Sequence, residues 1–272
     1  MKSYSIPRDA RKTAALCLAL VALVAVVLAS AARAAARPLP AAPHVAADPR
    51  SRTTRDESVR AKYPNKPLTL REDGVAILAF PPRAPSPSRP LTVVYLHGIH
   101  GRAENGCPWL REGASELGWL VCPGANEPLA NGTFSWAGTA ADQRNVVARA
   151  ERAAQAQGAD PERATVLVGF SQGAFVALDL ATRHLGHYGG LVLIGANVAP
   201  SRATLEASGV ERIVLAAGDL DGASGPMKRA TERLRREGMD ARFVSLGRIG
   251  HSYETTDKEG LRDAIVWAGG SP

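Results

Sequence analysis

The sequence of 272 residues predicts an α/β protein in which helices cover both faces of a mostly parallel β-sheet. Two observations carry this prediction. From residue 91 onward, short runs rich in Val, Ile and Leu alternate with longer segments whose apolar residues recur at helical spacing. In addition, Gly158 and Gly238 follow two of the helical segments, at the place where glycine commonly ends a helix. The chain shows no internal repeat.

A hairpin is expected ahead of this alternation. Residues 68–70 and 75–80 are apolar runs on either side of Asp73-Gly74, a dipeptide typical of hairpin turns. We expect them to form an antiparallel pair at the edge of the sheet. Residues 81–90 carry five prolines, which do not fit inside a helix or strand, so this segment is expected to be an exposed connection.

The alternation then supplies the remaining elements in chain order. The expected strands are residues 91–96, 119–122, 165–168, 191–194, 213–217 and 242–246. The expected helices are residues 108–117, 142–157, 174–181, 227–237 and 257–267. Residues 123–140 are expected to form a loop. Because the strands are apolar on both sides, the sheet should be covered on both faces.

The first 36 residues have the three parts of a secretory signal peptide. A basic start precedes an uncharged run of Ala, Leu and Val over residues 14–29, and small residues that suit a signal peptidase follow. We therefore expect an exported protein, periplasmic or extracellular. The apolar run is just short of the ~18 residues of a spanning helix. An uncleaved anchor, which would hold the protein at the membrane, is the competing interpretation.

The rest of the chain divides in two. Residues 37–67 are rich in Pro, Ala, Arg and Thr without a sustained apolar period, so they are expected to be a linker or an irregular lead-in. Residues 68–272 are expected to form the folded domain. The net charge of +7 is concentrated at the start, where residues 1–36 hold five basic side chains and one acidic one. Without a basic stripe in the remainder, a nucleic-acid partner is not expected.

Two of the three cysteines lie in the expected domain. Cys17 belongs to the predicted signal, which leaves Cys107 and Cys122. Both should lie near the same edge of the sheet, Cys122 at a strand end and Cys107 in the loop before the preceding helix, so a disulfide is sterically attainable. An even pair in an exported protein favours that disulfide. Two reduced, packed cysteines are the alternative.

The segment Gly169-Phe170-Ser171-Gln172-Gly173 has the pattern G-x-S-x-G. It lies between an expected buried strand and an expected helix, which is the context of a nucleophile elbow. In such a turn a serine projects its Oγ out of the sheet. The N–H of Gln172 would then lie at a helix N-terminus, where the helix dipole favours a developing negative charge. An ordinary glycine-rich turn is the simpler interpretation, and the strand and helix around it argue against it.

Two further kinds of side chain follow later strands. Asp219 and Asp221 share the turn after residues 213–217, and His251 follows the last expected strand. The carboxyl ends of parallel strands meet at one edge of the sheet, where ligands bind. A serine needs a base to remove its proton and a carboxylate to orient that base, so these residues are candidates for a Ser-Asp-His triad in the chain order of elbow enzymes.

Together these segments resemble the α/β-hydrolase fold, and most closely its small uncapped esterases, the phospholipase/carboxylesterase and dienelactone hydrolase-like groups. The resemblance covers roughly residues 92–267. It implies that Asp221 rather than Asp219 is the acid. It also implies that the residue after the His97-Gly98 pair, here Ile99, is the second oxyanion donor through its N–H, beside Gln172. The His97 ring is then structural.

The resemblance also bears on the substrate. Family members with selective pockets often insert a cap after the strand that follows the elbow helix, but here that link, residues 197–211, is too short for one. We therefore expect an open site with no cap domain. His100, where many members have a small or apolar residue, and Phe134 and Trp136 in the 123–140 loop are the candidate substrate-binding residues. For the two aromatic side chains, packing under the loop is an equal alternative.

No metal or other cofactor is expected. Asp219 and Asp221 resemble the start of a calcium loop, but the rest of that pattern is missing. His184 and His187 stand three residues apart near the end of the elbow helix without a third ligand. Histidines that complement the helix dipole are the better interpretation of that pair.

The sequence therefore predicts an exported serine hydrolase that cleaves a small-molecule ester or thioester through an acyl-enzyme. A binding protein with this fold but no turnover is the competing class, and the intact candidate triad argues against it. A serine peptidase or an acyltransferase would use the same three residues. The oligomeric state is not predicted.

Overall fold

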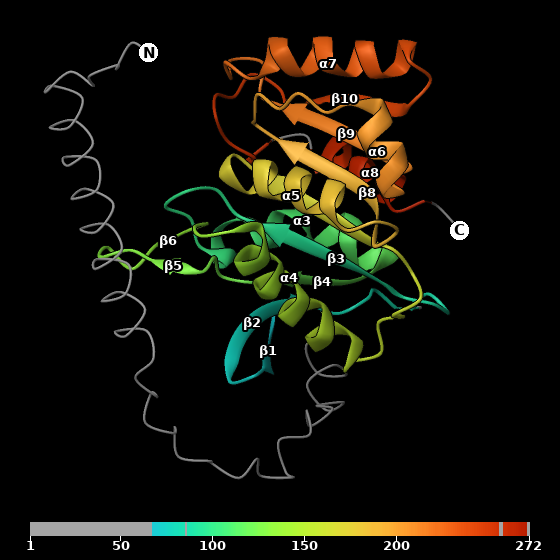
Figure 1. Cartoon of the computed structure of the whole chain (residues 1–272). Helices are drawn as coiled ribbons and strands as arrows, with labels where there is room; N and C mark the ends of the chain where they lie inside the picture. Colours follow the sequence, from blue (N-terminus) through green and yellow to red (C-terminus); the bar gives the residue numbers. More distant parts are fainter. Residues whose placement is uncertain (1–66, 85, 256–257, 271–272) are drawn as a thin grey trace, which may run out of the picture. The chain divides into compact units, whose positions relative to one another are not determined.

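The computed structural model describes residues 67–84, 86–255 and 258–270. The predicted signal segment and nearly all of the predicted linker lie outside these residues. An eight-stranded sheet runs through the described part in the order β1-β2-β4-β3-β7-β8-β9-β10 (Figure 1). Its strands are β1 (Leu68–Glu72), β2 (Val75–Phe80), β3 (Leu91–Leu96), β4 (Gly118–Cys122), β7 (Thr165–Phe170), β8 (Tyr188–Ile194), β9 (Arg212–Ala217) and β10 (Asp240–Ser245).

The sheet is mostly parallel, as predicted. The strands from β4 through β3, β7, β8 and β9 to β10 pair in parallel. The expected hairpin supplies the two antiparallel strands at one edge, with β1 paired to β2 and β2 to β4. Asp73 and Gly74 between β1 and β2 have φ of 50° and 78°. Positive φ at both central residues is the geometry of a tight hairpin turn that matches the twist of the strands.

Helices cover both faces of this sheet. They are α3 (Ala103–Leu117), α4 (Ala140–Gln155), α5 (Gln172–Arg183), α6 (Arg202–Ser208), α7 (Ser224–Arg236) and α8 (Lys258–Ala268). One core contains buried residues of α4, α5, α6 and α7, and a second core contains those of α3 and α8. All residues of β3 and β4 are buried, because these strands lie between the two cores. The predicted continuous apolar strands thus reflect a sheet that is covered on both sides.

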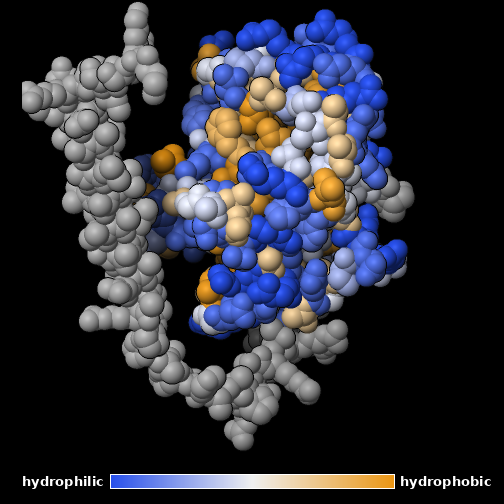
Figure 2. Space-filling view, viewed as in Figure 1, coloured by the Kyte–Doolittle hydropathy of each residue, from blue (hydrophilic) through white to orange (hydrophobic). Residues whose placement is uncertain are grey.

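The charged amphipathic helix predicted near the C-terminus is α7. Its buried residues include Met227, Ala230 and Leu234, and its last turn carries three arginines. Figure 2 shows hydrophilic residues over the region where Figure 1 places α7. Basic side chains in the last turn of a helix also complement its dipole. Of the helices in the described part, none is long and apolar enough to cross a bilayer.

Two expectations about elements are wrong. Helix α3 begins at Ala103 instead of at residue 108, with Pro108 inside it. Proline favours the first helical position, but burial of Ala103 and Cys107 extends this helix upstream. The 123–140 loop contains two short paired strands, β5 (Glu127–Pro128) and β6 (Phe134–Ser135). The link between β8 and β9 contains one helix that was not predicted, the seven-residue α6. Elements this short leave too little periodicity for a sequence pattern to reveal.

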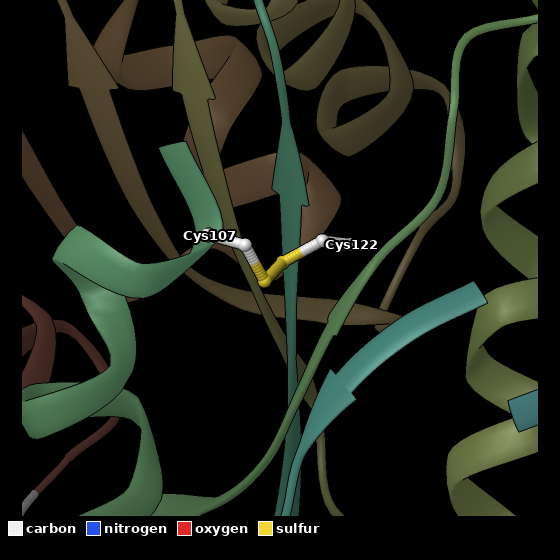
Figure 3. The surroundings of a disulfide bond; sticks show 2 residues. All are labelled: Cys107 and Cys122. Atoms are coloured by element: carbon white, nitrogen blue, oxygen red, sulfur yellow. A yellow bond between two sulfur atoms is a disulfide. The ribbon is translucent and has the colours of Figure 1, made fainter. Parts of the chain in front are cut away.

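A disulfide joins Cys107 and Cys122, with their Cα atoms 6.1 Å apart (Figure 3). Cys107 lies in α3 and not in a loop, whereas Cys122 is the last residue of β4 as expected. Both side chains are fully buried in the core that α3 forms. The bridge therefore ties α3 to the carboxyl end of β4.

Candidate active site

Ser171 lies in the tight turn between β7 and α5, with φ of 53° and ψ of −117°. Non-glycine residues rarely adopt positive φ, and such strain is typical of functional positions. The flanking glycines have a steric reason. A Cβ on Gly173 would lie 2.1 Å from the carbonyl oxygen of Leu96, and one on Gly169 would lie 2.4 Å from that of Gly173. The close packing of α5 against β3 and β7 thus requires glycine on both sides of the serine.

A chain of hydrogen bonds leads from Ser171 to a carboxylate. Ser171 Oγ lies 3.0 Å from Nε2 of His251, and Nδ1 of His251 lies 2.8 Å from Oδ2 of Asp221. Because a carboxylate only accepts, Nδ1 carries the ring proton and Nε2 is free to accept the serine hydroxyl. The three residues follow β7, β9 and β10, so the strand order brings them to one edge of the sheet. This is the geometry in which imidazole removes a serine proton.

The two candidate acids are in different surroundings. The Asp221 side chain is 6% exposed, and its second oxygen accepts a hydrogen bond from the N–H of Ala223 at 2.8 Å. Asp219 is 40% exposed and accepts a hydrogen bond from Ser245 Oγ. The structure therefore places Asp221 beside His251, and Asp219 beside the end of β10.

Aromatic rings hold the His251 loop in place. The ring of Phe170 is centred 5.0 Å from that of His251, and Tyr253 packs edge-on against Phe170 at 4.7 Å. Burial raises the pKa of Tyr253 above its usual range. Gly195 after β8 lies against the same group, since a Cβ there would be 3.2 Å from both Asp221 Oδ2 and His251 Cε1. Sequence reasoning missed Gly195, although a glycine directly after a buried strand was the available signal.

The turn after β3, residues 97–101, lies next to the serine. A Cβ on Gly98 would be 3.2 Å from the Cβ of Ser171. His97 is buried, its Nε2 accepts the N–H of Ala125 at 3.1 Å, and its Nδ1 donates to the carbonyl of Gly98 at 2.8 Å. Burial lowers the pKa of His97. A neutral ring that makes two backbone hydrogen bonds is structural, which agrees with the expected role of His97.

The two expected oxyanion donors are neighbours of these residues. Ile99 follows Gly98, and its side chain is 53% exposed, so its apolar group takes no part in the core. Gln172 follows Ser171 as the first residue of α5. The N–H groups of the first helical turn have no partner within the helix. Ile99 thus follows a residue that packs against Ser171, and Gln172 follows Ser171 itself. Their role as oxyanion donors stays a prediction.

Solved structures with the same fold include three that align over most of this chain. TT1662 from Thermus thermophilus is 19% identical, with a TM-score of 0.54 over 76% of this chain and 99% of that one. Est1E from Butyrivibrio proteoclasticus, with bound ferulic acid, is 12% identical, with a TM-score of 0.52 over 74% and 96%. FphF, a fluorophosphonate-binding serine hydrolase from Staphylococcus aureus, is 14% identical, with a TM-score of 0.53 over 75% and 97%.

A comparison with protein-family models also finds a hydrolase family. Residues 142–263, which include all three residues of the hydrogen-bonded chain, match the phospholipase/carboxylesterase family. The described part of the chain therefore has the α/β-hydrolase fold, and residues 142–263 resemble the phospholipase/carboxylesterase family within it. With a serine at the elbow, it is a serine hydrolase. A search of curated proteins found no match.

One of the predicted substrate residues of this hydrolase has another task. Trp136 is only 4% exposed, and its indole N–H donates to the carbonyl of His97 at 2.8 Å. The prediction that Trp136 forms a pocket wall is therefore wrong, and the ring packs under the loop. Phe134 is partly buried against the same core, and its wall role stays a prediction. His100 is exposed with φ of 55°, beside Ile99.

The histidine pair lies at and just beyond the C-terminal end of α5, and its interaction with the helix dipole stays a prediction. His184 follows the last residue of α5, and burial together with the charge of Arg144 lowers its pKa. His187 lies beyond the helix, with Nε2 2.8 Å from Oε1 of Glu151 on α4. The buried Glu151 carboxylate also pairs with Arg144. Within the described residues no group of three or more His, Cys, Asp or Glu side chains is arranged to hold a metal.

Proposed function

We propose that this chain is an exported esterase that hydrolyses a carboxylic ester or thioester through an acyl-enzyme on Ser171, His251 and Asp221. The observation that carries the proposal is the hydrogen-bonded chain from the strained serine through the imidazole to a buried carboxylate. A protein that only binds has no use for this arrangement, in which the carboxylate orients the imidazole and the imidazole removes the serine proton.

The reaction follows from the geometry. Ser171 Oγ attacks the carbonyl carbon while His251 Nε2 takes its proton. The resulting oxyanion accepts hydrogen bonds from the N–H groups of Ile99 and Gln172. His251 then protonates the departing alcohol or thiol, which leaves an ester on Ser171. Water attacks this ester and gives its proton to His251. The carboxylic acid leaves and Ser171 regains its proton.

The substrate is proposed to be a small-molecule ester. The link between β8 and β9 contains only α6, whose seven residues form no cap over the site. His251 is half exposed beside the serine, so the reacting groups are open to solvent. The ferulic acid in Est1E is a reason to include aromatic as well as aliphatic acyl groups in a substrate panel. Phe134 and His100 are the proposed contacts for such groups.

Export is proposed from the N-terminal sequence and the cysteine pair. Residues 1–36 have the pattern of a signal peptide. The disulfide between Cys107 and Cys122 suits an oxidising compartment. The periplasm or the cell exterior is therefore the proposed location, and a membrane anchor is the alternative if residues 1–36 stay attached.

A fluorophosphonate probe tests the proposed reaction, because it labels only an activated serine at a useful rate. We expect wild-type protein to be labelled at Ser171 and to hydrolyse p-nitrophenyl butyrate. Ser171→Ala should abolish labelling and lower kcat by about 10⁴–10⁶-fold. Ser88→Ala, at an exposed serine of the β2–β3 connection, is the matched control and should behave as wild type. A folded wild type that neither labels nor hydrolyses esters would instead be a binding protein.

A further inference from the structure

The short strand β6 is bound to the first residue of the elbow helix. The side chain of Gln172 makes one hydrogen bond to Ser135 of this strand and two to Trp136, which follows it. Its Oε1 accepts from the N–H of Trp136 at 3.0 Å and from Ser135 Oγ at 3.2 Å, and its Nε2 donates to the carbonyl of Trp136 at 2.9 Å. Because the Gln172 carboxamide both donates to and accepts from the backbone of Trp136, it fixes the orientation of that backbone as well as its distance from α5.

The same strand is bound to the turn after β3. The buried indole N–H of Trp136 donates to the carbonyl of His97 at 2.8 Å. The N–H of Phe134 donates to the carbonyl of Gly101 at 3.0 Å. These two bonds attach to either end of residues 97–101, the segment that contains Ile99. Residues 134–136, here called the brace, thus contact both segments that carry the proposed oxyanion donors.

We propose that the brace sets the separation of the two oxyanion donors, with Trp136 and the Gln172 side chain as positioning residues. This inference rests on the proposed function. The two N–H groups come from different elements, the turn after β3 and the start of α5. The brace connects those elements through side chains that touch no reacting atom.

The effect of such a link should fall on the transition state. Donors stabilise an oxyanion when they lie about 2.7–3.1 Å from its position, and loss of one donor costs about 10²–10³-fold in kcat. A displacement on the order of 1 Å costs up to about 10²-fold. The ground-state carbonyl carries less charge, so KM should change little.

Two variants cut the link at its two ends. Trp136→Phe keeps a ring in the core and removes the donor to His97. Gln172→Met keeps the length of the side chain and its backbone N–H but removes all three bonds to the brace. Asn126→Ala is the matched control, because Asn126 makes a similar two-bond carboxamide contact to Ala137 in the same loop. In the described contacts, Asn126 bonds neither α5 nor residues 97–101.

The experiment measures kcat and KM for p-nitrophenyl butyrate, inhibition by an alkyl trifluoromethyl ketone, and the melting temperature. A trifluoromethyl ketone forms a tetrahedral adduct with serine, so its affinity reports on the oxyanion site. We expect both variants to lose about 10–100-fold in kcat and similarly in ketone affinity, with KM within about threefold. Because both substitutions break the same linkage, the kcat of the double variant should be little lower than that of the less active single variant. Asn126→Ala should stay within about twofold of wild type.

The outcomes separate this inference from the proposed function. A wild type that hydrolyses the ester, together with folded variants of unchanged kcat and ketone affinity, overturns the brace and leaves the esterase intact. Variants whose only change is a lower melting temperature overturn it too, since that is a structural role. If Trp136→Phe does not fold, Gln172→Met alone decides between these results. An unreactive wild type overturns the esterase and the brace together.

Discussion

Ser171 and Asp221 show how single side chains are fixed for the proposed reaction. Positive φ at a non-glycine residue costs on the order of 1–3 kcal/mol, and Ser171 is held there by β7 on one side and α5 on the other. Asp221 is buried and accepts one hydrogen bond from backbone and one from His251. One carboxylate oxygen is therefore held by the backbone N–H of Ala223, and the other accepts the hydrogen bond from the imidazole.

The choice between the two aspartates can be tested directly. Asp221→Asn should lower kcat by about 10⁴-fold, because an amide in that position favours the wrong imidazole tautomer. Asp219→Asn is the matched control. It should stay within a few-fold of wild type, since Asp219 contacts Ser245 and not His251. Steady-state hydrolysis of p-nitrophenyl butyrate by the two variants decides, and the reverse ranking would show that Asp219 is the acid.

A second prediction at this scale concerns pH and His97. Burial lowers the pKa of His97, and a proton added to Nε2 would face the N–H of Ala125. The unfolded chain, with a histidine pKa near 6.5, takes up that proton more readily than the folded protein. Stability should therefore be complete above about pH 6.5 and decrease as the pH falls toward the lower folded pKa.

Urea unfolding of wild type and His97→Gln between about pH 5 and 8 checks this. The wild type should lose more stability toward acid than the variant, in which this titration is absent. Parallel pH dependences in the two proteins would mean that His97 takes up its proton equally in both states.

At the scale of elements, sequence patterns predicted the units whose residues are contiguous in the chain. The β7–turn–α5 unit was predicted because its apolar strand, its two glycines and its helix are contiguous in sequence. The brace was not, because a two-residue strand has no period and its bonds reach Gln172 and His97 from far along the chain. The same limit explains Trp136. An aromatic residue in a loop gives no sign of whether its indole N–H has a buried partner.

The disulfide gives a prediction about two elements, α3 and β4. It closes a loop with a sequence separation of 15, for which the chain-entropy relation gives about 3 kcal/mol of stabilisation. The double variant Cys107→Ala, Cys122→Ala should unfold with a free energy lower by about that amount. Alanine is chosen because a serine hydroxyl would be buried at either position.

Chemical unfolding with and without reductant supplies the control. Reductant should bring wild type close to the double variant and leave the variant unchanged. A wild type whose unfolding free energy does not respond to reductant would contain two free thiols in place of the bridge.

At the scale of the molecule, two cores on opposite faces of the sheet hold one edge rigid for the site. All the proposed catalytic and positioning residues lie between His97 and His251, and the helices and strands that carry them lie within the described part. The parallel order of the strands was predictable from the alternation of patterns. Which of the polar residues at that edge meet depends on loop geometry that the strand and helix patterns do not encode, and the choice of Asp221 over Asp219 came from the resemblance to a known family instead.

The last prediction follows from the position of the proposed site residues, which all lie between His97 and His251. A chain that lacks residues 1–36 should retain the full kcat of the purified exported protein, within about twofold, since no residue of the proposed reaction lies in that segment. Produced in the periplasm behind an unrelated signal peptide, it should carry no alkylatable thiol before reduction, because Cys107 and Cys122 are then paired. Intact-mass measurement of the natural exported form should show an N-terminus near residues 30–37. A full-length mass in the membrane fraction would make residues 1–36 an anchor, and free thiols in an exported form would contradict the disulfide and leave the esterase reaction to its own test.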